Sequence, residues 1–154
     1  MKEELLKKIP EINQITNKEI RDKTIAVFIE ALEEGGWKVA DLDRIPFTLL
    51  IADNPISLLT HIRAVTASAL KVAEVFDDYY KDHFKIDRDI LLSGAILHDV
   101  GKLLECEETP KGFRKHLGGK MMRHPFSGAG LALKHFKRLC KFNYSEIRDK
   151  CKHF

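Results

Sequence analysis

Apolar residues recur every three to four positions along most of the chain, which is the spacing of amphipathic helices. Asn17 is placed to cap one of these helices, and Gly35 and Gly36 are placed to end it. A further helix is expected to begin near Asn143. The spacing predicts the other helices over residues 3–8, 18–34, 57–79, 88–104 and from 124 or 127 to about 140.

Strand signals are nearly absent, because no run of alternating β-branched residues is bounded by turn residues. Residues 105–120 are charged and contain glycines, so we expect a loop there. The predicted fold class is therefore all-α. The helix over residues 57–79 is expected to bury one stripe, which consists of Ile62, Val65, Ala69, Val72, Ala73 and Phe76.

The length of 154 residues fits one domain with its own core, over residues 1–154. Within it, we expect residues 1–55 to supply N-terminal helices and residues 56–154 to form the core that carries the chemistry. Hydrophobic residues make up 44% of the chain and charged residues 32%, as in ordinary soluble domains. No repeat or shift in composition indicates a second domain.

The location expected for the protein is the cytoplasm. No apolar run is long enough to cross a membrane, and the N-terminus lacks the apolar core of a signal peptide. Cys106, Cys140 and Cys151 are odd in number and widely spaced, which is typical of reduced thiols. The net charge of +3 is compatible with phosphorylated small molecules. It does not indicate nucleic acid, because no dense basic stripe with interleaved aromatic residues is present.

The adjacent pair His98-Asp99 is the first candidate for chemistry. On a helix, neighbouring side chains point about 100° apart, so both can bind one metal only at the side of the helix between them. Asp99 shares its helix face with Leu92 and Ile96, which turns the carboxylate toward the core. A buried carboxylate costs several kcal/mol unless it is paired or binds metal.

Two other predicted helices each carry a histidine that can complete such a site. His61 lies on the helix over residues 57–79, and His124 precedes Pro125 at a helix start. Three histidines and an aspartate match a divalent metal site with open positions for water. A metal bound in this way lowers the pKa of a coordinated water and supplies hydroxide near neutral pH. Lys102 follows His98 by one turn, where its ammonium could hold a phosphate beside the metal.

Each of these residues also has an ordinary explanation. A histidine on an apolar helix is more often a core residue, and an isolated His-Asp pair often occurs by chance. Lys102 could simply be a solvated lysine at a helix end, where its positive charge interacts favourably with the helix dipole. Arg114 and Lys115 lie in a basic stretch between two candidate ligand segments, so they could meet an anionic substrate or remain solvated. Taken together, the three histidine segments indicate a metal-binding site.

These segments resemble the HD superfamily of metal-dependent phosphohydrolases. The matching pieces are LLTHIRAVTASAL, AILHDVGKL and MMRHPFSGAGLAL, which together span about residues 57–133. HDxGK followed by HPxxGxxL is most similar to the branch of cyclic-phosphate and cyclic-dinucleotide phosphodiesterases. The resemblance implies an HD-domain helical bundle that holds one or two divalent ions (Mn, Fe, Mg, Ni, Co or Zn). It implies as metal ligands His61, His98, Asp99 and His124.

The resemblance also implies roles for individual residues. Asp99 would bridge the ions if there are two, and a metal-bound water or hydroxide would attack phosphorus. Lys102 would neutralise charge on the substrate phosphate, with Arg114 and Lys115 as further substrate contacts. In the phosphodiesterase branch a further histidine follows the HPxxG helix, and His153 falls where it could lie. The family pattern closes with an aspartate on a later helix, which this chain is expected to lack.

We therefore expect a metal-dependent phosphohydrolase or phosphodiesterase that acts on a small phosphorylated molecule, with nucleotides among the candidates. Neither a membrane nor nucleic acid is expected as a partner, and a homo-oligomer would be one way to complete the metal shell. The missing aspartate favours an alternative, a catalytically impaired HD-fold module that binds a nucleotide or a partner helix. A metal-dependent oxygenase is a third alternative, against which Lys102 and the basic stretch argue.

Overall fold

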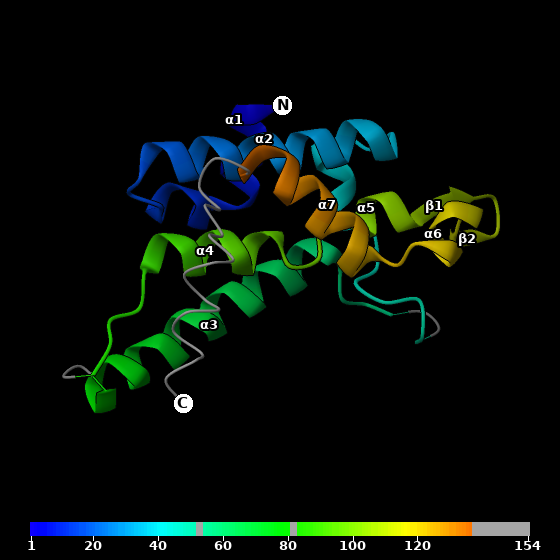
Figure 1. Cartoon of the computed structure of the whole chain (residues 1–154). Coiled ribbons are helices and arrows are strands. Elements are labelled where there is room, and N and C mark those ends of the chain that lie inside the picture. The colour runs from blue at the N-terminus through cyan, green and yellow to red at the C-terminus, as the bar shows by residue number, and fades with distance from the viewer. Residues whose placement is uncertain (52–53, 81–82, 137–154) are drawn as a thin grey trace, which may run out of the picture.

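The computed structural model describes residues 1–51, 54–80 and 83–136. Almost all regular structure in these ranges is helical (Figure 1). The α-helices are α1 (Lys2–Lys8), α2 (Lys18–Gly35), α3 (Leu58–Tyr80), α4 (Arg88–Leu97), α5 (Lys102–Glu105), α6 (Leu117–Met121) and α7 (His124–Phe136). The shorter elements are the 3₁₀ helices η1 (Pro10–Gln14) and η2 (Val39–Asp43) and the strands β1 (Cys106–Thr109) and β2 (Gly112–Lys115). The predicted all-α class is confirmed.

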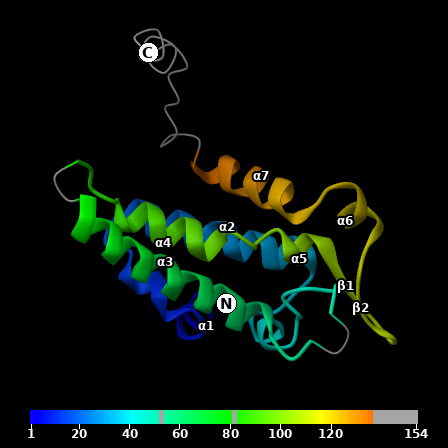
Figure 2. The same cartoon turned by 90° about the horizontal axis from the view of Figure 1, so that it is seen from below.

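Helix α4 packs against both α2 and α3, and α7 packs across α2 and α5. The antiparallel pair β1–β2 lies with α6 at one end of the helical body (Figures 1 and 2). None of the helices within the described ranges combines the length and the apolar composition that a membrane span requires. The candidate site lies where the first turn of α3, the α4–α5 turn and the first turn of α7 meet.

Helix α2 begins and ends as its sequence predicts. The Asn17 side chain accepts hydrogen bonds from the backbone N–H groups of Glu19 and Ile20, at 2.9 and 3.2 Å. These bonds satisfy donors that have no partner within the helix. Gly36 ends the helix with φ 72°, a conformation that glycine adopts without steric cost.

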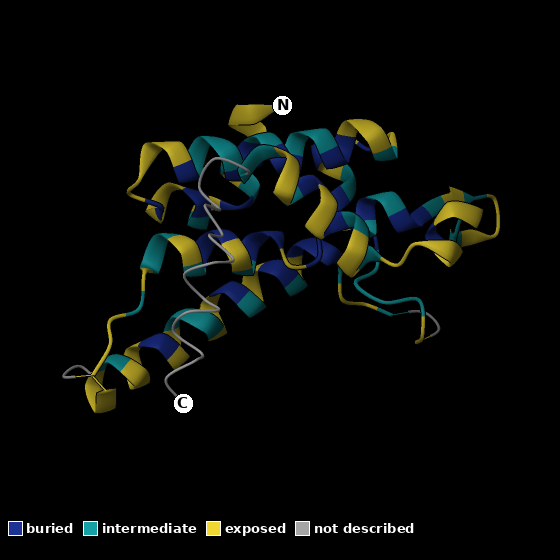
Figure 3. Cartoon of the chain, viewed as in Figure 1, coloured by how far each residue is buried: buried dark blue, intermediate teal, exposed yellow. Residues whose placement is uncertain are grey.

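The core lies between α2 and the elements that pack on it (Figure 3). Phe28 and Leu32 of α2 are fully buried, as are Ile62 of α3 and Ile96 of α4. Two buried polar contacts fix these elements to one another. Thr24 bonds to Ser93 across α2 and α4 at 2.8 Å, and the Trp37 indole donates to the Leu103 carbonyl at 2.8 Å. Buried polar groups paired in this way avoid the cost of desolvation.

Two predicted elements are wrong in detail. The helix expected over residues 88–104 is interrupted, because α4 ends at Leu97 and α5 begins only at Lys102. The loop expected over residues 105–120 contains the hairpin β1–β2 and the short helix α6. Four-residue strands that pair only with each other are too short to show a clear alternation in the sequence.

The predicted buried stripe of α3 holds only in part. Ile62 and Ala73 are buried, but Val72 is 55% exposed and Phe76 is 41% exposed. Phe76 packs against Tyr80 and Phe84 rather than under another helix of the described ranges. Figure 3 shows that the C-terminal end of α3 is largely exposed. Periodicity identified the apolar face correctly, but it does not determine what covers that face.

The segment between η2 and α3 is held close to the start of α3. Phe47 N–H donates to the Ile56 carbonyl at 3.1 Å, and Leu58 N–H donates to the Ile45 carbonyl at 2.7 Å. Together with an isolated bridge between Pro46 and Ser57, these bonds bring the two ends of the segment side by side. The Phe47 ring lies against His61 in the first turn of α3.

Asp89 joins the N-terminus of α4 to the start of α2. Its carboxylate accepts hydrogen bonds from the backbone N–H groups of Thr16 and Asn17, at 2.7 and 2.8 Å. These bonds hold the pKa of Asp89 below its usual value. Folding therefore favours the ionised form of Asp89, and this form stabilises the folded protein. The stabilisation is fully present above the unfolded pKa of about 3.9 and is lost as pH falls through the lower folded pKa.

We expect Asp89→Asn to lower the free energy of unfolding at pH 7, with a difference from wild type that shrinks as pH falls below about 4. Urea denaturation at pH 7, 4 and 3 measures it. The control is Asp78→Asn, at an exposed position near the end of α3, for which we expect no comparable loss at pH 7. A deficit in Asp89→Asn that stays constant from pH 7 to pH 3 would contradict this linkage.

Candidate metal centre

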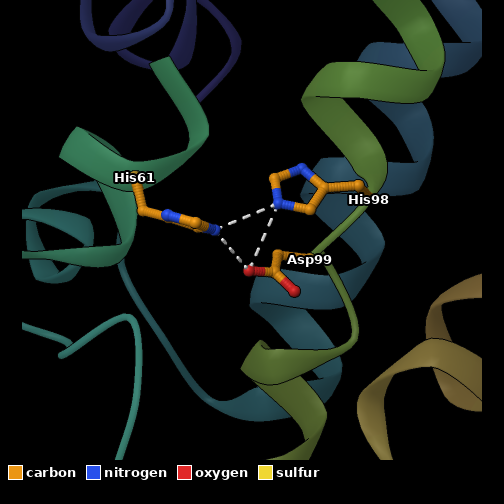
Figure 4. A group of neighbouring side chains, drawn as sticks. All are labelled: His61, His98 and Asp99. Carbon is orange, nitrogen blue, oxygen red and sulfur yellow. Dashed lines mark hydrogen bonds and ion pairs between the residues drawn. The ribbon is translucent and has the colours of Figure 1, made fainter. Parts of the chain in front are cut away.

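Three side chains from α3 and the α4–α5 turn converge on one point (Figure 4). His61 lies in the first turn of α3, His98 follows the last residue of α4, and Asp99 comes next in the turn. The Nε2 atoms of the two histidines are 3.3 Å apart. Asp99 Oδ2 lies 3.2 Å from His61 Nε2 and 3.3 Å from His98 Nε2. Three potential ligand atoms therefore form a nearly equilateral triangle.

The size of this triangle fits a divalent ion. With bonds of about 2.1 Å, neighbouring ligand atoms lie about 3.0 Å apart around an octahedral ion and about 3.4 Å apart around a tetrahedral one. The observed separations of 3.2–3.3 Å fall between these values. Imidazole nitrogen and carboxylate oxygen are donors that Mn, Fe, Co, Ni and Zn accept. The residues present therefore fit such an ion.

Asp99 is the buried member of the group, with 5% of its surface exposed. Burial would raise the pKa of Asp99, but hydrogen bonds from His98 and Lys102 outweigh it and hold the pKa far below its usual value. Lys102 Nζ lies 2.7 Å from Oδ2, the same oxygen that faces the two histidines. The carboxylate is therefore ionised at neutral pH and attracts positive charge.

Each of these histidines is oriented by a neighbour. His98 Nδ1 lies 2.7 Å from the Ala95 carbonyl, so an Nδ1–H donates there and Nε2 faces Asp99. The bond to Asp99 raises the pKa of His98. The ring of Phe47 stacks on His61 with centroids 4.7 Å apart. Burial lowers the pKa of His61, which favours the neutral imidazole that metals bind.

His124, the first residue of α7, approaches Asp99 from the other side. Its Nε2 lies 3.2 Å from Oδ1, whereas His61 and His98 face Oδ2. The two oxygens of one carboxylate thus face different sets of imidazoles. An aspartate with this surrounding can bind one ion through each oxygen. The sequence analysis placed these four residues in one site, and the structure brings their side chains together.

The HD domain family matches residues 58–150, a stretch that contains all four residues. That match covers more than half of the chain. The chain belongs to the HD domain family. Proteins of this family are helical, generally bind divalent metals and generally act as hydrolases, as expected from the sequence. No curated protein and no solved structure has significant similarity to the chain.

Gly101 lets α7 of this HD domain approach the His-Asp turn. A Cβ atom at Gly101 would lie 2.1 Å from the His124 carbonyl oxygen and 2.7 Å from the Gly128 nitrogen. These are backbone atoms and cannot move aside as the end of a flexible side chain would. Helix α7 therefore approaches the turn closely at this glycine, and this approach brings His124 to Asp99.

Beside the His-Asp turn of the HD domain lies a cavity of about 130 Å³. Basic side chains line it from three segments, namely Lys102, Lys115 and Arg123, together with His124. Lys115 and Arg123 bind the Glu105 carboxylate at 2.8 and 2.9 Å. Arg114, the other substrate contact predicted in this stretch, instead pairs with Glu107 on the exposed hairpin at 2.8 Å. The substrate roles of Lys102, Arg114 and Lys115 stay predictions.

Sequence analysis missed three residues of this region: Phe47, Glu105 and Arg123. Glu105 is a charged residue in the apolar run Leu103 to Cys106, which is a signal of a buried pair. Burial would raise the pKa of Glu105, but hydrogen bonds from Lys115 and His124 lower it to about 2. No local signal identifies Phe47 or Arg123. The predicted ligand His153 lies outside the described residues.

We expect Gly101→Ala to lower the free energy of unfolding by about 1–3 kcal/mol and to weaken metal binding, because the new methyl group overlaps the backbone of α7. Gly94→Ala, on α4 where a Cβ meets no atom within 4 Å, is the matched control. It should be neutral or stabilising, by up to about 1 kcal/mol. Urea denaturation and a Mn(II) titration of both variants measure these effects. Equal stability and equal affinity of the two variants would contradict the close approach as the reason for Gly101.

Proposed function

We propose that this protein is a metal-dependent phosphohydrolase or phosphodiesterase that acts on a small phosphorylated molecule, for which a nucleotide is one candidate. The observation that carries the proposal is the buried Asp99 carboxylate, whose oxygens face His61 and His98 on one side and His124 on the other. Lys102 and His124, which both contact this carboxylate, also line a cavity of about 130 Å³. Membership of the HD domain family supports the reaction class.

In the proposed site, His61, His98 and Asp99 would hold one divalent ion, and Asp99 and His124 would supply ligands for a second. A divalent ion bound there would lower the pKa of a coordinated water and supply hydroxide near neutral pH. Asp99 contributes the negative charge that retains the ions. The Ala95 carbonyl and the Phe47 ring fix the His98 and His61 rings, so that little reorganisation is needed on binding.

Lys102 is the proposed contact to the substrate phosphate. Its ammonium lies between Asp99 Oδ2 and the Phe47 carbonyl oxygen, to which it donates. With the Asp99 charge neutralised by a bound cation, the Lys102 ammonium would be available to a phosphate in the cavity that Lys102 lines. A fixed positive charge at this place stabilises the charge that develops on the phosphoryl oxygens.

The first experiment combines metal analysis with hydrolysis. We expect purified protein to retain transition metal and to hydrolyse p-nitrophenyl phosphate or its bis-ester with added Mn(II), Fe(II), Co(II), Ni(II) or Mg(II). Asp99→Asn should lower metal retention at least about tenfold and abolish hydrolysis. Asp89→Asn, a carboxylate on α4 away from the site, is the control and should keep both. Wild-type protein that neither binds metal nor hydrolyses these esters would sink the proposal.

A second prediction separates Lys102 from the metal ligands. Lys102→Met removes the charge and keeps most of the apolar stem, so we expect kcat/KM to fall by about 100-fold. Metal affinity should be retained or tighter, because no ammonium competes for Asp99 Oδ2. Lys120→Met, at an exposed position on α6, is the control for loss of a basic residue. Unchanged hydrolysis, or loss of metal from Lys102→Met, would contradict this role.

A non-catalytic HD module that binds a partner helix is the second candidate. An apolar groove of about 750 Å³ runs between α4 and α7 as far as His98. Ile90 and Leu133 line it and are more than half exposed, which suits the apolar face of an amphipathic helix. Wild-type protein that binds metal at Asp99 but hydrolyses neither a phosphomonoester nor a phosphodiester would favour this candidate.

A further inference from the structure

Glu105 is a second buried carboxylate close to the candidate metal centre. It is the last residue of α5, and only 2% of its surface is exposed. Oε1 accepts from Lys115 Nζ at 2.8 Å and from Arg123 Nε at 2.9 Å. Oε2 accepts from the backbone N–H of His124 at 2.8 Å and lies 2.6 Å from His124 Nδ1. Both carboxylate oxygens are therefore occupied by groups of the protein.

The two contacts to His124 determine how its ring is held. A carboxylate oxygen only accepts, so the short contact requires a proton on Nδ1. Nε2 is the other ring nitrogen, and it lies 3.2 Å from Asp99 Oδ1. Because the backbone N–H of His124 binds the same Glu105 oxygen, the start of α7 and the ring are fixed together. A neutral ring held in this way presents the Nε2 lone pair to the space beside Asp99.

We propose that Glu105 is a positioning residue, which holds His124 in the Nδ1–H form with Nε2 directed to the metal that Asp99 binds. This inference rests on the proposed function, since it assigns a second carboxylate to the same centre. Glu105 does not itself bind the ion, because Lys115, Arg123 and His124 already use its oxygens. Carboxylates that accept from the free nitrogen of a metal-bound histidine orient the ring and raise its basicity.

A purely structural role is the competing explanation, because Glu105 also ties β2 and α7 to α5. Another carboxylate, that of Glu30, provides a control for a purely structural role. Glu30 of α2 accepts from Lys134 and from His135 Nε2 on α7, so it also joins α7 to a neighbouring helix through a lysine and a histidine. The residues of this second cluster are not among the proposed metal ligands.

The first test compares Glu105→Gln with Glu30→Gln in the full chain by titration with Co(II) and Mn(II). Glutamine keeps the size of the side chain but loses the charge and one acceptor. We expect Glu105→Gln to weaken metal affinity by about 10- to 100-fold and to change the visible spectrum of bound Co(II). Glu30→Gln should keep the wild-type affinity and spectrum. Equal affinities in wild type and Glu105→Gln would overturn the proposal.

The second test needs no variant at Glu105, so it remains decisive if that substitution prevents folding. A long-range ¹H–¹⁵N correlation spectrum of zinc-loaded wild type reports which nitrogen of His124 carries the proton. We expect a protected Nδ1–H and metal bonding through Nε2. Bonding through Nδ1, or an unprotected Nδ1–H, would overturn the proposal. Wild-type protein that retains no metal would overturn the proposed function as well, whereas an unimpaired Glu105→Gln overturns the positioning role alone.

Discussion

The buried negative charge of Asp99 is the constraint around which the site is arranged. Ionised carboxylates are rarely buried without partners, because their desolvation costs several kcal/mol. Here Lys102 and three imidazoles, from α3, the α4–α5 turn and α7, surround the carboxylate. Removing any one of these elements would expose or unbalance the charge. The charge of the Asp99 side chain is compensated only when α3, the α4–α5 turn and α7 pack on one another.

The interruption between α4 and α5 contains two of the residues that converge on the site, His98 and Asp99. In a continuous helix, neighbouring side chains diverge by about 100°, which limits how two adjacent residues share a ligand. Helix α4 ends at Leu97, although His98 keeps helical backbone dihedral angles and Val100 N–H donates to the Leu97 carbonyl at 3.0 Å. In this turn Asp99 is buried, whereas His98 stays at the surface. Gly101 then allows the backbone of α7 to contact the turn directly. The irregular turn therefore lies where the ligands converge.

The features that could be predicted from the sequence are those set by local patterns. The cap at Asn17, the stop at Gly36 and the face of each long helix follow from residues within a few positions of one another. The group of His61, His98 and Asp99 was predicted because His61 lies in one recognisable segment and the adjacent pair His98-Asp99 lies in another. The hairpin was missed because its strands are only four residues long. The exposure of Val72 and Phe76 depends on what lies opposite α3, and the contact of Glu105 with His124 joins residues 19 positions apart.

The different surroundings of the two buried carboxylates explain why a metal ion is expected at only one of them. Glu105 has two fully charged partners, Lys115 and Arg123, so its charge is already more than compensated. Within the described ranges, Asp99 pairs with a single lysine, and its other neighbours are imidazoles that are good ligands when neutral. A divalent ion placed beside Glu105 would be repelled by two cations held within 3 Å of the carboxylate. The same ion beside Asp99 meets one ammonium on a flexible stem, which can move toward an anionic substrate. The distribution of lysine and arginine therefore favours the proposed metal binding at Asp99 and the proposed supporting role of Glu105.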